Sequence, residues 1–222
     1  MKATRESEAQ LFLTGRAITW RQVTLFLFSS IALLGVLSTT ALTEYEDTEL
    51  LPRIFDLDRE LNVPVAFSSS LLFLCGLLTT RLVRTHSFPK IVVGSLAALF
   101  VFMGFDEMLK IHETLEKIAG VDFQILYLPL IIVSGLGWAT VWFRFKDLAR
   151  WIWTAGAAAW VISQLLEAWQ WGWWWNALMS KSETYQTLMI SEELLEMAGS
   201  SLFVIALFRH CWPKGLKISS RT

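Results

Sequence analysis

The feature that most constrains this chain is a series of apolar segments, each long enough to cross a lipid bilayer. The chain has 222 residues, of which 54% are hydrophobic and only 18% are charged. A helix needs about 20 apolar residues to cross a hydrocarbon core roughly 30 Å thick. Six segments meet this requirement, over residues 23–43, 63–83, 91–119, 123–143, 151–170 and 189–208.

These segments predict the fold class and the domain organisation. Because unpaired backbone amides are not tolerated in lipid, each segment is expected to be a helix. We therefore expect an all-α protein, a six-span transmembrane helical bundle, in which residues 1–222 form a single integral membrane domain. The lipid bilayer is then the first partner of the protein. The net charge of −1 offers no basic field for nucleic acid.

The basic residues predict the orientation of the bundle. The 19 lysines and arginines lie in one set of alternate connections, with the exception of Arg53, Arg59, Lys110, Lys117 and Lys181. Short cytoplasmic loops retain an excess of such residues. We therefore expect both termini to be cytoplasmic, in a plasma or inner membrane.

Tryptophans near the ends of the predicted spans fit the aromatic belts of membrane proteins. The residues at the expected cytoplasmic ends are Trp20, Trp142, Trp151, Trp153 and Trp212. Those at the expected outer end of the fifth span are Trp169, Trp171 and the run 173–175.

Ionisable residues lie inside three of the apolar segments, where an unpaired charge is unfavourable by several kcal/mol. They are Asp106, Glu107, Lys110, His112 and Glu113 in the third, Glu167 in the fifth, and Glu192, Glu193 and Glu196 in the sixth. A rise of about 1.5 Å per residue from the cytoplasmic basic residues places the acids of all three spans roughly 20–25 Å above that side. One layer in the outer leaflet therefore collects carboxylates from three helices.

The helical period predicts which of these side chains share a face. Glu192, Glu193 and Glu196 lie on one face of the sixth span, which Ser200 continues towards the middle of the bilayer. Gln164 and Glu167 likewise share a face of the fifth span.

In the third span, Asp106, Lys110 and Glu113 are expected to stack on one face, whereas Glu107 points elsewhere. The helix is expected to run on through this polar stretch and to stop at Gly120.

Oxygen-rich clusters of this kind suit a hard or borderline divalent ion, Ca, Mg, Mn or Fe, better than Zn. His86 and His210 lie at the cytoplasmic side, so the chain has no set of histidines for a zinc site. The predicted ligands are Asp106, Glu107, His112, Glu167, Glu193 and Glu196. His112 and Glu113 are the predicted catalytic residues, and Lys110, Gln164, Glu192 and Ser200 complete the polar site.

The leading hypothesis is a divalent-metal site that binds or acts on a membrane-resident molecule, such as a lipid or another hydrophobic small molecule. A second hypothesis is proton or cation translocation, because intramembrane carboxylates serve as relay groups. A third is a non-catalytic subunit or assembly factor whose acids meet a membrane protein partner. A purely structural alternative for Glu192 and Glu193 is the first turn of a helix capped by Ser191.

Overall fold

The computed structural model describes residues 17–44, 54–57, 62–84, 88–121, 123–170 and 183–217. The described part is almost entirely helical. Its elements in chain order are β1 (Ala17–Ile18), α2 (Trp20–Glu44), α4 (Val63–Val83), α5 (Lys90–Leu109), α6 (Ile111–Ala119), α7 (Phe123–Leu126), α8 (Leu128–Arg144), α9 (Asp147–Gln170), α10 (Glu183–Cys211) and β2 (Leu216–Lys217).

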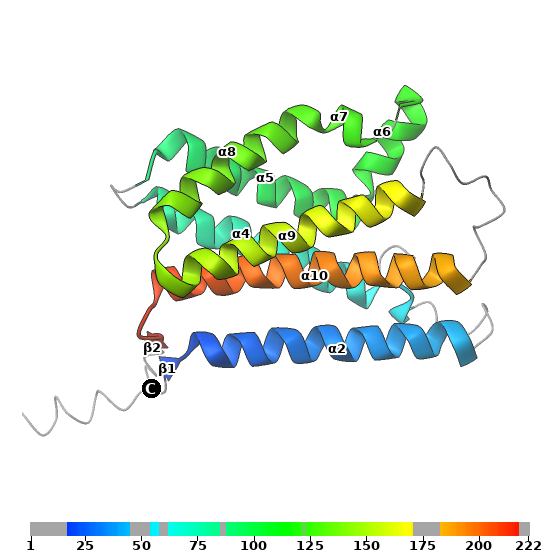
Figure 1. The fold of residues 1–222 in the computed structure, drawn as a ribbon, viewed down its shortest axis with the longest axis horizontal. Coiled ribbons are helices and arrows are strands. Elements are labelled where there is room, and N and C mark those ends of the chain that lie inside the picture. The colour runs from blue at the N-terminus through cyan, green and yellow to red at the C-terminus, as the bar shows by residue number, and fades with distance from the viewer. Residues whose placement is uncertain are drawn as a thin grey trace, which may run out of the picture.

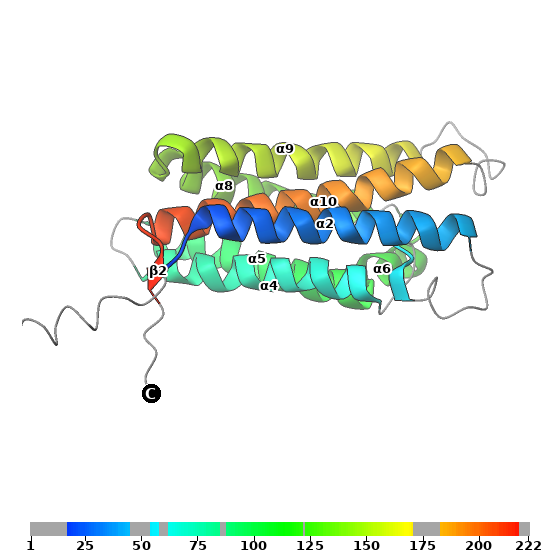
Figure 2. The same cartoon turned by 90° about the horizontal axis from the view of Figure 1, so that it is seen from below.

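The long helices form an elongated bundle in which successive helices run in opposite directions (Figures 1 and 2). Helix α10 is the central element, because it packs along α9, α4 and α2. Helix α5 packs on α4 and on α8. Helix α10 therefore lies between α9 on one side and the α4–α5 pair on the other (Figure 2). Side chains from α5 and from α9 can thus approach the same stretch of α10.

A short antiparallel sheet joins the two ends of the described chain. Ala17 pairs with Lys217, and Ile18 pairs with Leu216. The first long helix therefore begins beside the point where the last one ends, at the left in Figure 1. The start of α2 and the end of α10 thus lie at the same end of the bundle, which is the arrangement expected for an even number of passes.

Four helices are long and apolar enough to cross a membrane. They are the segments Trp20–Thr40, Val63–Val83, Lys90–Leu109 and Gln186–Cys211. Many apolar side chains point outward from the bundle; Ile91 is 85% exposed and Phe143 is 72% exposed. Large exposed apolar surface of this kind is typical of a protein that contacts lipid. The prediction of a helical membrane protein is supported at this level.

The two other segments predicted to span are less regular. Helix α8 has 17 residues, fewer than a typical span. Helix α9 has 24 residues but carries Asp147, Arg150 and Glu167, which make it less apolar. The fourth predicted segment is divided at Tyr127, which separates α7 from α8.

The third predicted segment also differs from the expectation of one continuous helix. Lys110 adopts the left-handed conformation, with φ 47° and ψ 50°, and separates α5 from α6. Its backbone N–H still bonds to the carbonyl of Asp106, so α5 ends with a closed turn. Helix α6 stops at Gly120, as predicted, where φ is 65° and glycine is the residue that adopts this conformation without strain.

Aromatic rings fill the core at the basic end of the bundle. Trp153 contacts Phe100, Phe145 and Phe203, with ring centroids 4.5 to 6.3 Å apart. Its indole N–H donates to the carbonyl of Trp138. Trp153 is fully buried, so its predicted place in an interfacial belt is wrong. Trp171 and residues 173–175 lie outside the described residues.

Candidate metal centre

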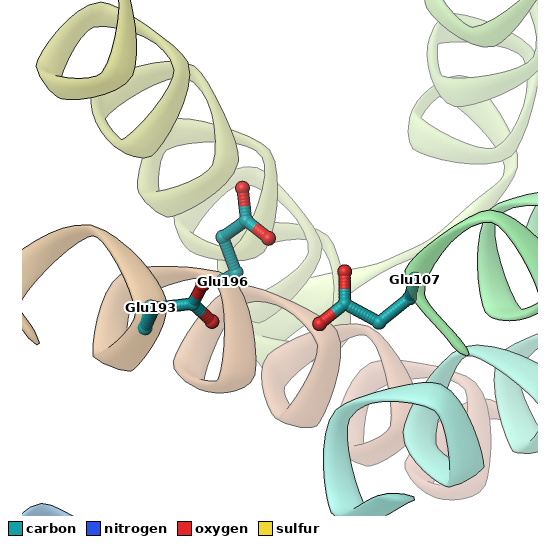
Figure 3. Close-up of side chains that lie close together, drawn as sticks. All are labelled: Glu107, Glu193 and Glu196. Atoms are coloured by element: carbon teal, nitrogen blue, oxygen red, sulfur yellow. The ribbon is translucent and has the colours of Figure 1, made fainter. Parts of the chain in front are cut away.

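Three carboxylates converge in the half of the bundle opposite the aromatic core. Glu107 comes from the end of α5, and Glu193 and Glu196 come from α10; one oxygen of each lies within 4.8 Å of the others. Figure 3 shows the three side chains directed into the space between the two helices. Glu196 is 8% exposed, and the other two are partly buried. We call Glu107, Glu193 and Glu196 the carboxylate triad.

The position of Glu192 and Glu193 within α10 excludes the alternative that Ser191 caps the helix that carries them. Helix α10 begins at Glu183, two turns before Ser191. The Ser191 hydroxyl donates to the carbonyl of Thr187, a bond within the helix interior. Glu192 and Glu193 therefore do not lie in the first turn of a helix. The three-residue spacing of Glu193 and Glu196 places these two acids on one face of α10.

Polar groups of α9 hold Glu196 from the other side. The Gln164 amide donates to Glu196 Oε1 at 3.1 Å, and the Ser163 hydroxyl lies 3.3 Å from the same oxygen. The Gln164 amide also donates to Glu167 Oε2 at 3.1 Å. Glu167 is thus linked to the triad through Gln164, in the second layer of the site.

A serine of α4 completes the surroundings of the triad. Ser68 is 2% exposed and lies next to the Glu107 carboxylate. Its hydroxyl forms no hydrogen bond of good geometry within the described residues. Buried hydroxyls are normally satisfied by protein or by water. The Ser68 hydroxyl therefore adds an oxygen beside the Glu107 carboxylate of the triad.

Asp106, unlike its neighbour Glu107, is not part of the carboxylate triad. It accepts hydrogen bonds from the backbone N–H of His112 at 2.8 Å, from the Tyr127 hydroxyl at 2.9 Å, and pairs with His112 Nδ1 at 3.0 Å. The bend at Lys110 turns α6 back and makes these contacts geometrically accessible. Asp106 and His112, predicted as ligands of the same ion as Glu107, pair with each other instead.

The environment of this network shifts two pKa values. Burial by itself lowers the pKa of His112, but the hydrogen bond to Asp106 and the charges of Asp106, Glu167 and Glu113 outweigh it, so the pKa is raised. Burial, together with the hydrogen bond to Asp106, raises the pKa of Tyr127. Tyr127 therefore acts as a hydrogen-bond donor near neutral pH.

Lys110 and Glu113 form an ion pair at 2.8 Å, and Lys117 joins it at 3.2 Å. Although burial opposes ionisation, these two lysines lower the pKa of Glu113. Glu113 is about one-third exposed and lies on α6, outside the triad. Its predicted catalytic role therefore has no support from proximity to the three carboxylates.

The remaining predicted residues lie around this centre rather than in it. Glu192 is partly buried on α10 beside Glu193. Ser200 is fully buried one turn beyond Glu196. Its hydroxyl accepts a hydrogen bond from the Trp160 indole at 3.2 Å, and its carbonyl lies 3.5 Å from Cys75 Sγ. Ser200 thus packs α4, α9 and α10 together.

Two neighbours of the site, Tyr127 and Ser68, were not predicted from the sequence. Tyr127 lies in a short break between α7 and α8, where no periodic pattern marks it. Ser68 belongs to a run of three serines in an apolar helix, and this run was the available signal of a polar face.

Comparison with curated proteins found no match, and comparison with solved structures found none either. A family model matches residues 23–211, which cover the helices from α2 to α10. The chain therefore belongs to the family described as a domain of unknown function, DUF8692.

Proposed function

We propose that the protein binds a divalent cation at the carboxylate triad and uses it to bind or act on a membrane-resident molecule. The observation that carries this proposal is the convergence of three carboxylate oxygens within 4.8 Å, from two helices, in the interior of the bundle. In this proposal α2, α4, α5, α8, α9 and α10 all span a plasma or inner membrane, as a single domain with both termini cytoplasmic.

The size of the triad fits an oxygen-liganded ion. If all three oxygens lay at the 4.8 Å limit, the centre of their triangle would be about 2.8 Å from each. Calcium–oxygen distances are about 2.3–2.6 Å, so small side-chain movements close the difference. Magnesium, manganese and iron need a tighter approach, with additional oxygens from Ser68 or water. No histidine or cysteine joins the group among the described residues, which disfavours zinc.

Electrostatics also favours a bound cation. Two ionised carboxylates 4.8 Å apart repel each other by about 3.5 kcal/mol at an effective dielectric constant near 20. None of the three acids forms an ion pair with a lysine or arginine in the part of the chain that the structure describes. A divalent ion or shared protons would relieve this repulsion.

The packing of the opposite half favours a binding site over a continuous ion path. Between the triad and the basic end of the bundle, Phe100, Trp153 and Phe203 form a buried cluster of aromatic rings. Rings packed in this way leave no chain of ionisable groups in the described core. This arrangement is more compatible with a site that opens to one side of the bilayer.

The proposal is tested by metal analysis and calorimetric titration of the purified protein after treatment with a chelator. We expect one of Ca, Mg, Mn or Fe(II) to bind in a 1:1 ratio and to raise the melting temperature. The double variant Glu193→Gln/Glu196→Gln should lose both effects. Glu116→Gln is the matched control, because Glu116 lies on α6 outside the triad.

Wild-type protein that binds none of these ions would overturn the proposal. The same conclusion would follow if the double variant bound them as tightly as the wild type. If instead the metal-free protein moved protons across liposomes, shared protons rather than a cation would neutralise the triad.

A further inference from the structure

The end of the bundle opposite the triad carries a second concentration of like charge. Helix α2 begins there, and α4 and α10 end there, beside the β1–β2 pair (Figure 1). The guanidinium of Arg81 lies 4.4 Å from the ring centroid of Trp212. Those of Arg209 and Arg21 lie 4.8 and 5.6 Å from the ring centroid of Trp20. We call Arg21, Arg81 and Arg209 the arginine cluster.

The cluster is held in place by its tryptophans. Trp20 and Trp212 both pack against the hydrophobic core, and Trp212 also contacts Phe208, with centroids 5.1 Å apart. A guanidinium stacked on an indole keeps its N–H donors at the edge of the ring, available to a planar or tetrahedral anion. The rings therefore hold the arginine side chains in place, so that binding of an anion costs little further side-chain entropy.

The positive charge of the cluster is not balanced within the described chain. No ion pair joins any of these arginines to an acid among the described residues. The other charged residues that the structure describes at this end are mostly basic as well: Arg84, Lys90, Arg144, Lys146, Arg150, Lys214 and Lys217. Among the described residues at this end, Asp147 is the one acid. Like charges gathered in this way create a positive potential that attracts anions.

We propose that the arginine cluster is a binding site for the phosphate headgroup of an anionic phospholipid. Three helices that are apolar enough to span a membrane meet at this site, so it lies at a membrane surface. Tryptophans enriched at such surfaces sit at the level of the headgroups. Arginines bind phosphate through paired N–H donors. The charge of the cluster, its position at the end of the spans and the type of its donors all match a lipid phosphate, independently of any cation at the triad.

The site is tested by titrating the full-length, detergent-purified protein with phosphatidylglycerol or phosphatidylcholine and counting bound lipids by native mass spectrometry. We expect wild-type protein to retain phosphatidylglycerol in preference to phosphatidylcholine. Each arginine that contacts the lipid phosphate is expected to contribute about fivefold in affinity, so Arg81→Gln/Arg209→Gln should weaken phosphatidylglycerol binding by roughly 25-fold.

The matched control removes the same charge at the same end, from residues without a described ring contact. Arg84→Gln/Lys90→Gln should weaken binding less than fivefold, because neither residue belongs to the cluster. Circular dichroism and the melting temperature in phosphatidylcholine report whether each variant is folded.

Three results would overturn the proposal. The first is equal binding of the two lipids by the wild type. The second is an equal loss in the two double variants, which would indicate a diffuse field. The third is displacement of the lipid by millimolar inorganic phosphate, which would indicate a site for the free anion.

Discussion

The side-chain amide of Gln164 donates to Oε1 of Glu196 at 3.1 Å, across the interface between α9 and α10. The same amide nitrogen donates to Glu167 Oε2. This arrangement fixes the plane of the Glu196 carboxylate relative to Glu107 and Glu193. Groups that orient a metal ligand in this way commonly change metal affinity by 10- to 100-fold when removed. Gln164 is therefore a positioning residue in the proposed site.

Replacing Gln164 by leucine should weaken cation binding about 10- to 100-fold, because Glu196 loses its orienting donor while the volume of the side chain is retained. The measurement is a calorimetric titration of chelator-treated protein. Ser163→Ala is the matched comparison, since the Ser163 hydroxyl is farther from Glu196, at 3.3 Å, and also bonds to the carbonyl of Trp160 at 2.8 Å. We expect a smaller effect there; equal affinity in the wild type and Gln164→Leu would contradict the assigned role.

Replacing Glu193 by glutamine should have opposite effects on the metal-free and metal-bound protein. Without a cation, the variant should melt at a higher temperature than the wild type at pH 8, because one of three crowded, buried acids is replaced by a side chain that needs no cation or proton to neutralise it. At a cation concentration of 100 times Kd, the wild type should gain about 2.7 kcal/mol of stability and the variant much less. Thermal melts with and without a chelator measure both. A variant that is less stable than the wild type under both conditions would indicate a structural role for Glu193.

The sequence indicated which acids lie near the site, but not which of them meet one another. The spacing of Glu193 and Glu196 and their depth relative to Arg209 placed them level with the end of α5, where Glu107 lies. The rotation of α5 about its own axis was not predictable, because helical periodicity relates residues within a helix and not between helices. Asp106 and Glu107 were therefore both predicted as ligands, although helical facing favoured Asp106, and in the structure Glu107 is the one that meets Glu193 and Glu196.

The bend that gives Asp106 its partners left no signal in the sequence. Lysine disfavours the left-handed conformation that Lys110 adopts, so a continuous helix was the natural prediction. Tertiary contacts compensate for this local strain: Asp106 binds His112 and Tyr127, and Lys110 pairs with Glu113. The helices of the four most apolar segments, in contrast, followed directly from hydropathy.

The pair of Asp106 and His112 should make stability depend on pH. Because the pKa of His112 is raised in the folded protein, the folded state binds this proton more tightly than the unfolded chain. The resulting stabilisation is complete below the unfolded value of about 6.5 and is lost as the pH rises through the folded value. Melting temperatures of chelator-treated protein should therefore fall over this range.

Asp106→Asn removes the charge that contributes most to raising the His112 pKa, so the decline should become shallower. His112→Gln should abolish the part of the decline that belongs to this residue. Identical pH profiles for the wild type and both variants would show that the pair does not contribute to stability.

The close approach of α9 and α10 gives a last prediction, about how the site is positioned. A Cβ atom on Gly199 would lie 2.5 Å from Trp160 Cδ1 and 3.0 Å from the backbone oxygen of Gly156. Gly199→Ala should therefore push the two helices apart and destabilise the protein by about 1–3 kcal/mol. Because Gln164 and Glu196 face each other across this same interface, cation affinity should fall with stability.

Gly135→Ala is the control, since a Cβ there would meet nothing within 4 Å and alanine favours a helix. Urea unfolding and cation titration of both variants test the prediction, which fails if Gly199→Ala matches Gly135→Ala in both.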